Sequence, residues 1–336
     1  MMVKKSALLI AFLLLASLAM PAMAEVDEPL DAFDDRPLDE PLTLPDWFKV
    51  SFLDIKEDLE EANHHGRGLI IYFGMKHCPY CKAHLENNWG RPDIINYTRQ
   101  HFDVIGIDVR GSKPVTELAG TELNEKEYAK QQKANFTPSL IFYDKHGQRA
   151  FKLSGYRQAY QFKAVLEYVA DDHHQRESFP QYFARAETAE SFGQDALNES
   201  PLFETLMADK KQINRPSVVF FERPRCHACD VLHGTPLKNS ALTKRLEKFN
   251  TMQVDISMNN TVITPQGKST TASQWAKALR IDYTPTLIFF DTTGKEILRI
   301  DSVVWFYRLR NILDYVLSED YKQYPNFQDW RFRKNR

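Results

Sequence analysis

Apolar and polar residues along the chain follow a pattern that occurs twice. In the first copy a helical periodicity at 52–66 precedes an unbroken apolar run at 69–73, and in the second copy 203–215 precedes 217–221. Apolar positions spaced three and four apart indicate an amphipathic helix, whereas a short unbroken apolar run is typical of a buried strand. The pattern therefore predicts a helix followed by a buried strand at the start of each copy.

Each copy continues in the same order after its buried strand. A helical stretch leads to a second apolar run that carries an acid, and a further helix, a hairpin with a glycine-containing turn and a closing helix follow. The second run, the hairpin and the closing helix lie at 104–108, 137–156 and 158–169 in the first copy and at 252–256, 284–303 and 307–317 in the second. The order β-α-β-α-β-β-α predicts an α/β fold of two tandem domains, each a mixed β-sheet flanked by helices.

The composition is that of a soluble globular protein with enough residues for two domains. The chain has 336 residues, of which 43% are hydrophobic and 26% are charged, and its formal net charge is −2. A nearly neutral chain lacks the basic surface of nucleic-acid-binding proteins, so we expect no nucleic-acid partner. No stretch beyond residue 24 is long and apolar enough to span a bilayer, so we expect no stable membrane insertion.

The first 24 residues have the pattern of a cleaved signal peptide. Two lysines at 4–5 precede the apolar run 7–16, and residues 22–24 read Ala-Met-Ala, a small-x-small cleavage site. The apolar run is too short to be a comfortable membrane span. We therefore expect export, most simply to a bacterial periplasm.

The segments outside the two copies are more polar and more charged than the copies. Residues 25–46 hold nine acids and four prolines, which predicts a solvated, disordered leader, with an acidic docking arm as the alternative. The chain ends in WRFRKNR, whose four bases predict a solvated tail. The expected segments are a signal peptide at 1–24, a leader at 25–46, domains at 47–170 and 201–318, a linker with weak helical character at 171–200 and a tail at 319–336.

The four cysteines form two pairs, Cys78 with Cys81 and Cys226 with Cys229. A disulfide that closes so small a loop removes little entropy from the unfolded chain, which argues against a purely structural bridge. Each first cysteine follows a buried strand and opens a helix, where free N–H groups and the helix dipole favour a thiolate. We therefore predict that Cys78 and Cys226 attack disulfides, while Cys81 and Cys229 are the more buried resolving thiols.

A Thr-Pro pair lies at a matched distance from each cysteine pair. Pro138 follows Cys78 by 60 positions, and Pro285 follows Cys226 by 59. A proline that opens a strand after a polar residue is a place where a fold can hold a cis peptide bond. We expect cis bonds after Thr137 and Thr284, whose backbones would then pair with an extended substrate segment.

Together these motifs resemble the thioredoxin superfamily over nearly all of residues 47–318, and most closely the SoxW-like thioredoxin-fold proteins of the bacterial periplasm. The resemblance rests on CPYCK at 78–82, LNEKE at 123–127, Thr-Pro at 137–138, CHAC at 226–229 and DYTPT at 282–286. It implies a reversible dithiol–disulfide oxidoreductase with a cis-proline beside each cysteine pair, and we expect no further cofactor. The best-known thioredoxins carry a buried Asp six residues before the first cysteine, where this chain has Tyr72 and Phe220.

The residues around the cysteines differ between the two sites. Pro79 and Tyr80 give the first site a glutaredoxin-like dipeptide, whereas His227 follows the attacking thiol of the second site. A protonated His227 would favour the thiolate and the reduced form, which predicts that the second site is the stronger oxidant. Glu222, four residues before Cys226, is a candidate proton acceptor, with an unremarkable carboxylate at the rim of the site as the alternative.

These features predict an exported protein disulfide oxidoreductase that reduces or isomerises disulfides. The expected partners are disulfide-containing periplasmic proteins and a membrane electron donor, because an oxidising compartment supplies no electrons itself. Copper or zinc capture, with His84 or His233 beside a cysteine pair, is an alternative, although we expect no metal. A binding or chaperone module with one vestigial cysteine pair is another. The His64-His65 and His173-His174 pairs are expected to be solvated loop residues.

Overall fold

The computed structural model of the chain describes residues 33–186, 196–203 and 215–334. The predicted signal peptide at 1–24 lies outside the described residues, as do 204–214 of the predicted helix at 203–215. Among the helices of the described ranges, none has the length and apolar character that crossing a membrane requires.

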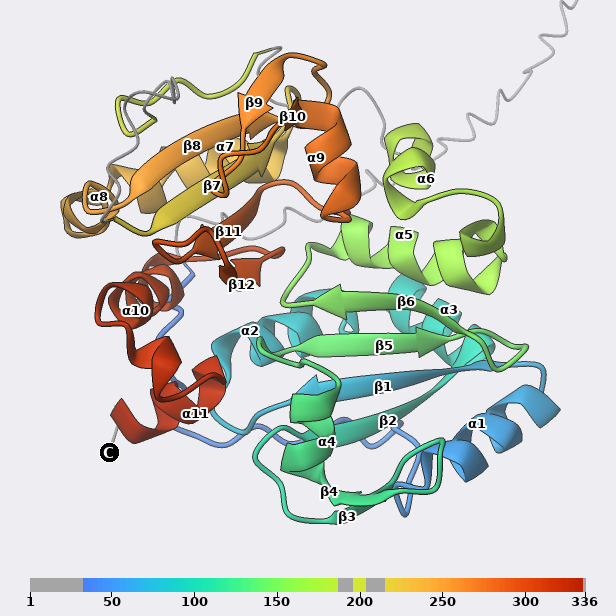
Figure 1. The fold of residues 1–336 in the computed structure, drawn as a ribbon. Helices are drawn as coiled ribbons and strands as arrows, with labels where there is room; N and C mark the ends of the chain where they lie inside the picture. The colour runs from blue at the N-terminus through green and yellow to red at the C-terminus, as the bar shows by residue number, and fades with distance from the viewer. Residues whose placement is uncertain (1–32, 187–195, 204–214, 335–336) are drawn as a thin grey trace, which may run out of the picture. The chain divides into compact units, whose positions relative to one another are not determined.

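The first domain is built on a four-stranded mixed sheet with the strand order β2-β1-β5-β6 (Figure 1). Strand β1 pairs parallel with β2 and antiparallel with β5, and β5 and β6 form the predicted hairpin. All seven residues of β1 are buried, as its unbroken apolar run predicts. The strands are β1 Gly68–Gly74, β2 Phe102–Asp108, β5 Ser139–Tyr143 and β6 Arg149–Ser154.

The second domain repeats this sheet strand for strand, with the order β12-β11-β7-β8. Strand β7 pairs parallel with β8 and antiparallel with β11, and β11 and β12 form the hairpin. The strands are β7 Ser217–Glu222, β8 Asn250–Asp255, β11 Thr286–Phe290 and β12 Glu296–Ile300. The predicted fold class, two tandem α/β domains with mixed sheets, is thus confirmed.

Helices cover both faces of each sheet, because successive strand residues point to opposite sides. In β7, for example, Phe220 belongs to one apolar core with α7, α8 and α10, whereas Phe221 belongs to another core with α9. The helices of the first domain are α1 Ile55–His64, α2 Pro79–Ala83, the π-helix η2 His84–Asn88, α3 Pro92–His101, α4 Glu125–Gln131 and α5 Ala159–Ala170. Those of the second are α7 His227–Gly234, the short 3₁₀ turn η6 Pro236–Lys238, α8 Ser240–Leu246, α9 Ala272–Ala278 and α10 Phe306–Leu317.

Two small hairpins were not predicted from the sequence. Each domain has one, β3 Pro114–Thr116 with β4 Glu122–Asn124 and β9 Thr261–Ile263 with β10 Ser269–Thr271. Their strands are three residues long and largely exposed or half-buried, so they carry no hydrophobic alternation that a sequence pattern could reveal.

The prediction of a disordered leader is wrong for its described part, residues 33–46. The N–H of Leu42 donates to the carbonyl of Lys76 at 2.7 Å, and the N–H of Leu38 donates to that of His77 at 3.4 Å. The side chain of Asp35 is 5% exposed. The leader therefore lies along the loop before Cys78 and forms backbone hydrogen bonds with it. The charge pattern of the leader does not indicate these contacts or the burial of Asp35.

The tail is also more ordered than predicted, whereas the described part of the linker agrees with its prediction. The linker has the expected helical character in η3 His173–Gln175 and in α6 Phe179–Ala186, and Phe179 and Tyr182 are buried. The predicted solvated tail is wrong, because η7 Asp320–Lys322 and α11 Phe327–Lys334 follow α10. Phe327 and Trp330, three residues apart on one face of α11, belong to the apolar core of the second domain. Their burial holds this helix against the domain although the segment carries four basic residues.

Candidate redox sites

Each cysteine pair lies at the start of a helix that follows a buried strand. Cys78 is the N-cap of α2 and Cys226 the N-cap of α7, and each pair forms a disulfide. The N–H of Cys81 donates to the Sγ of Cys78 at 3.0 Å, and that of Cys229 to the Sγ of Cys226 at 3.2 Å. The sulfur of each first cysteine therefore meets a backbone N–H at the positive end of a helix, an arrangement that favours a thiolate when the pair is reduced.

The Thr-Pro pairs meet the first cysteine of each site. Both Thr–Pro peptide bonds, at Pro138 and Pro285, are cis, as the matched spacing predicts. The Sγ of Cys78 lies 3.2 Å from the hydroxyl of Thr137, and the Sγ of Cys226 lies 3.4 Å from the hydroxyl of Thr284. The structure thus brings the predicted residues together at both sites; their roles toward a substrate stay predictions.

Burial of the attacking thiol differs between the sites. Cys226 is 5% exposed and Cys229 is 1% exposed, in the predicted order. At the first site, however, Cys78 and Cys81 are both 1% exposed, so the prediction of a more accessible attacking thiol is wrong there. At this site the second domain forms a cover that contacts Tyr80 and Thr137, the neighbours of Cys78.

Two residues at the start of α10, Trp305 and Arg308, make this cover. The guanidinium of Arg308 donates to the carbonyl of Thr137 at 2.9 Å and lies 3.5 Å from the centre of the Tyr80 ring. The N–H of Trp305 donates to the Tyr80 hydroxyl at 2.9 Å. The Thr137 carbonyl, expected to bind substrate, is therefore occupied by a side chain of the same protein.

Asp35 of the leader completes the cover. Its carboxylate accepts hydrogen bonds from the Tyr80 hydroxyl at 2.8 Å and from the N–H groups of Tyr307 and Arg308 at 2.8 and 2.7 Å. Burial, and then the nearby Asp35 charge, raise the pKa of Tyr80 well above its usual range, and burial lowers the pKa of Arg308 to about 10. The cover thus connects the Arg308 guanidinium and the Asp35 side chain through the neutral phenol of Tyr80.

Sequence reasoning missed Asp35, Trp305 and Arg308, which lie far from the cysteines along the chain. No motif spacing links them to Cys78, and Asp35 was interpreted only as one of nine leader acids. An acid that accepts hydrogen bonds from the N–H groups of a helix can be recognised in the sequence only when it directly precedes that helix.

The second site opens into a cavity of about 140 Å³. Cys226, His227 and Thr284 line it together with residues of α5 from the first domain and of α6 from the linker. A separate cavity of about 370 Å³ reaches Cys81 rather than Cys78, beneath Leu42 of the leader. The first domain thus contributes to the surroundings of Cys226, as the second domain does to those of Cys78.

Two of the predicted tuning residues differ in burial. His227 is exposed at the first position of α7. Glu222 is fully buried at the end of β7, which excludes the alternative of a rim carboxylate. It shares a hydrogen bond of 2.9 Å with His233 and accepts one of 2.7 Å from Gln253. Its proposed part in proton transfer stays a prediction.

The two histidines considered for metal capture have other partners. His84 packs between Trp89 and Phe162, and the Asn88 amide donates to its Nδ1 at 2.9 Å. Burial lowers the pKa of His84 to about 3, so this ring is neutral at ordinary pH. His233 is held by Glu222. Nothing in these contacts draws either ring toward its cysteine pair.

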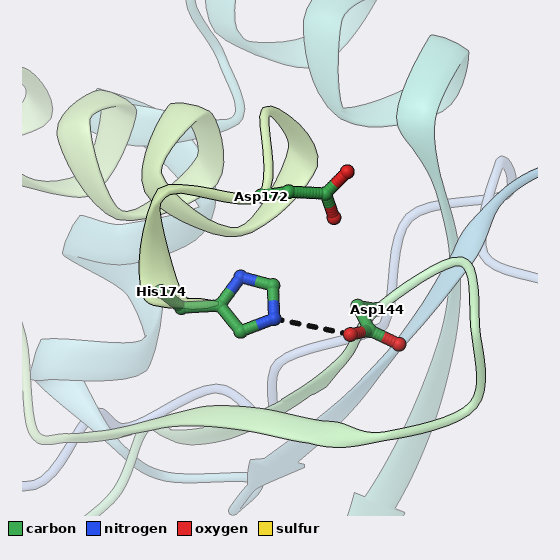
Figure 2. A group of neighbouring side chains, drawn as sticks. All are labelled: Asp144, Asp172 and His174. Carbon is green, nitrogen blue, oxygen red and sulfur yellow. Dashed lines mark hydrogen bonds and ion pairs between the residues drawn. The ribbon is translucent and has the colours of Figure 1, made fainter. Parts of the chain in front are cut away.

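Within the described ranges, one group of three metal-ligand side chains lies close together, Asp144, Asp172 and His174 (Figure 2). The Nε2 of His174 is 3.0 Å from Asp144, and Lys145 forms a 2.7 Å ion pair with Asp172. Asp144 also accepts N–H groups of the β5–β6 turn. This group ties the turn to η3, and the prediction that His174 is solvated is wrong because its side chain is only 9% exposed.

The family model described as a thioredoxin-like domain matches the chain twice, at residues 55–170 and 203–317. The chain belongs to the thioredoxin-like family. No curated protein sequence matches it. The resemblance to SoxW-like proteins stays a prediction.

Several solved structures resemble one domain of this thioredoxin-like protein. A thioredoxin-fold protein from Helicobacter pylori is 22% identical, with 40% of this chain and 91% of that chain covered and a TM-score of 0.31. A DsbH oxidoreductase is 14% identical, with 39% and 91% covered and a TM-score of 0.29. The oxidised C-terminal domain of DsbD from Neisseria meningitidis is 14% identical, with 32% and 86% covered and a TM-score of 0.26.

Family and geometry together define the chemistry. Each thioredoxin-like domain carries a Cys-x-x-Cys pair that forms a disulfide at a helix start. These are the features of a thiol–disulfide oxidoreductase.

Proposed function

We propose that the protein is an exported thiol–disulfide oxidoreductase that reduces or isomerises disulfides of other exported proteins. The observation that carries this proposal is the second site, where Cys226 caps a helix, contacts the hydroxyl of Thr284 and borders a cavity. Export is supported by the signal-peptide pattern at 1–24.

The reaction follows from the positions of the two thiols. The Cys226 thiolate attacks one sulfur of a client disulfide, and the other client sulfur leaves as a thiolate that takes up a proton. The Cys229 thiol then loses its proton and attacks Cys226, which releases the client and closes the Cys226–Cys229 disulfide. Two electrons pass from the protein to the client in reduction. In isomerisation a second client thiolate, rather than Cys229, attacks the client sulfur of the mixed disulfide, so that a new client disulfide forms, Cys226 leaves as a thiolate and no net electrons are transferred.

Reduction or isomerisation is favoured over bulk oxidation on two grounds from the sequence, the absence of a buried acid at the Tyr72 and Phe220 positions and the threonine before each cis-proline. A reductant in an oxidising compartment consumes its dithiols, so a membrane electron donor must restore them. We therefore propose such a donor as the second partner.

Trapping of mixed disulfides tests the proposal. In a Cys229→Ala variant the client cannot be released by resolution, so we expect exported proteins to be captured on Cys226 and identified after non-reducing electrophoresis. The Cys226→Ala variant is the matched control and should capture none. If the two variants capture the same proteins, capture does not depend on the attacking thiol, and a binding module is the better description.

A further inference from the structure

The cavity beside Cys226 has walls that determine what kind of client segment it accepts. We propose that it binds one large apolar side chain, best an aromatic ring, located next to the cysteine in an extended client segment. This inference rests on the proposed function, and it names the class of polypeptide on which that function acts.

The position of the cavity places its contents beside the reacting sulfur. Cys226, His227 and Ala228 of the Cys-x-x-Cys turn line it together with Thr284. The Sγ of Cys226 lies 3.4 Å from the Thr284 hydroxyl, so attacking sulfur and cis-proline loop lie at the same edge of the cavity. A residue adjacent to a client cysteine would reach this space when its sulfur meets Cys226.

An aromatic wall of the cavity comes from α5 of the first domain and from α6 of the linker. Phe179 and Phe183 of α6 have ring centres 5.4 Å apart, and Phe183 stacks on Tyr160 of α5 at 6.1 Å. All three rings line the cavity. Its volume of about 140 Å³ is close to the ~150 Å³ of an apolar cavity that accommodates benzene. Size and lining therefore fit one phenyl ring or one branched aliphatic side chain.

Arg157, a buried charged side chain that lines the cavity, already has partners within the protein. The guanidinium of Arg157 lies 3.7 Å from the centre of the Tyr283 ring and donates to the carbonyl of Ser154 at 3.2 Å. Arg157 is 7% exposed, so it forms part of the wall rather than a site for a client carboxylate. The lining also includes Arg223 and Asp282, but most of it is apolar, so the cavity is expected to select mainly by apolar contact.

Among the described residues, the first site is more closed than the second. Cys78 is 1% exposed, and the Thr137 carbonyl holds Arg308 at 2.9 Å. A client segment that pairs with the cis-proline loop would find its place taken there. Clients are therefore expected to meet Cys226 first.

The test uses the full chain with Cys78→Ser and Cys81→Ser, so that the second site alone reacts. The substrates are symmetrical disulfide-linked dimers of one short peptide whose cysteine is flanked by Phe, Leu, Ala or Ser. The reduced protein is mixed with each dimer, and quenched samples give the second-order rate constant. We expect the Phe peptide to react about tenfold faster than the Ser peptide, because one apolar group in a pocket gives discrimination of this order.

Two substitutions on α6 locate the effect. Ala184→Trp would fill the cavity that Ala184 lines, and it should reduce the Phe-to-Ser ratio to near one. Arg185→Trp is the matched control and should keep the ratio, because Arg185 is the next residue along α6 but is not among the residues that line the cavity. Equal rates for all four peptides on the parent chain, or an unchanged ratio in Ala184→Trp, would overturn the inference.

A small polar disulfide, bis(2-hydroxyethyl) disulfide, separates this inference from the proposed function. It needs no pocket, so its reduction by the parent chain reports only on the Cys226–Cys229 chemistry. If it and every peptide remain oxidised, the proposed function fails. If it is reduced but the peptides show no preference, only the pocket assignment fails.

Discussion

His84 is a buried neutral imidazole, and this makes stability depend on pH. Its pKa is about 3 in the folded protein, against 6.5 for an ordinary histidine, because burial disfavours the charged ring. The unfolded chain therefore binds the extra proton first, and the stability due to neutral His84 is lost as the pH falls below about 6.5. By linkage the loss at pH 5 is about 2 kcal/mol.

Urea unfolding at pH 7 and pH 5 measures this loss. A His84→Leu variant should show a smaller fall in the free energy of unfolding between these pH values than the parent. His65→Leu, at an exposed position, is the control and should leave the fall unchanged. The same pH dependence in His84→Leu and the parent would mean that His84 does not contribute.

Arg308 is a second residue whose burial has a chemical consequence. Its Nη2 and the Sγ of Cys78 both contact the Thr137 carbonyl, at 2.9 and 3.5 Å, so the cation is a near neighbour of the attacking thiol. A cation favours the thiolate and hence the reduced site. We expect Arg308→Met to make the first site more reducing by about 30 mV, which corresponds to roughly one unit in the pKa of Cys78.

Equilibration with glutathione in a Cys226→Ser and Cys229→Ser background measures this potential. Arg310→Met, two residues further along α10, is the control. The potential of the second site can be measured in the same way. The comparison tests the prediction that His227 makes the second site the stronger oxidant, because Arg308 also favours the thiolate at the first site. A first-site potential that Arg308→Met leaves unchanged would show that the guanidinium does not act on the thiol.

At the scale of elements, the repeated strands were predictable and the connections between distant segments were not. The runs at 69–73 and 217–221 are fully buried in both faces of a sheet, which leaves an unbroken apolar signal. The leader and α11 were misread because charge dominates their composition, whereas one buried acid and two aromatic side chains determine their packing. The pattern of apolar and charged residues within a segment predicts which of its residues are buried, but it does not predict contacts with residues far away in the sequence.

The leader and α10 are joined by Asp35, which gives an element-scale prediction. Its carboxylate accepts three hydrogen bonds, two of them from the first turn of α10, in a buried position. We expect Asp35→Asn to lower the free energy of unfolding by about 1–3 kcal/mol, because a charged partner of buried donors is lost. Urea unfolding checks this value. Asp39→Asn, an exposed leader acid, should change it by less than about 0.5 kcal/mol.

At the scale of the whole molecule, the described residues from Asp34 onward form one compact unit in which the two sites have different surroundings. The second domain covers Cys78 through Arg308 and Trp305, while the first domain builds one wall of the cavity beside Cys226. Two nearly identical folds thus present unlike sites, because each site takes residues from the other domain.

This difference predicts the order in which the thiols react. In the reduced full chain, Cys226 should be alkylated by iodoacetamide several-fold faster than Cys78, because the reagent must reach the sulfur and Cys78 is 1% exposed beneath Arg308. Mass spectrometry of peptides from timed samples gives both rates. Arg308→Met removes one contact of the cover, so it should speed the alkylation of Cys78 even though it disfavours the thiolate, and leave Cys226 unchanged. A slower alkylation of Cys78 in this variant would mean that charge, not access, limits the reaction at the first site. Equal alkylation rates for the two thiols in the parent chain would mean that the cover does not persist in solution.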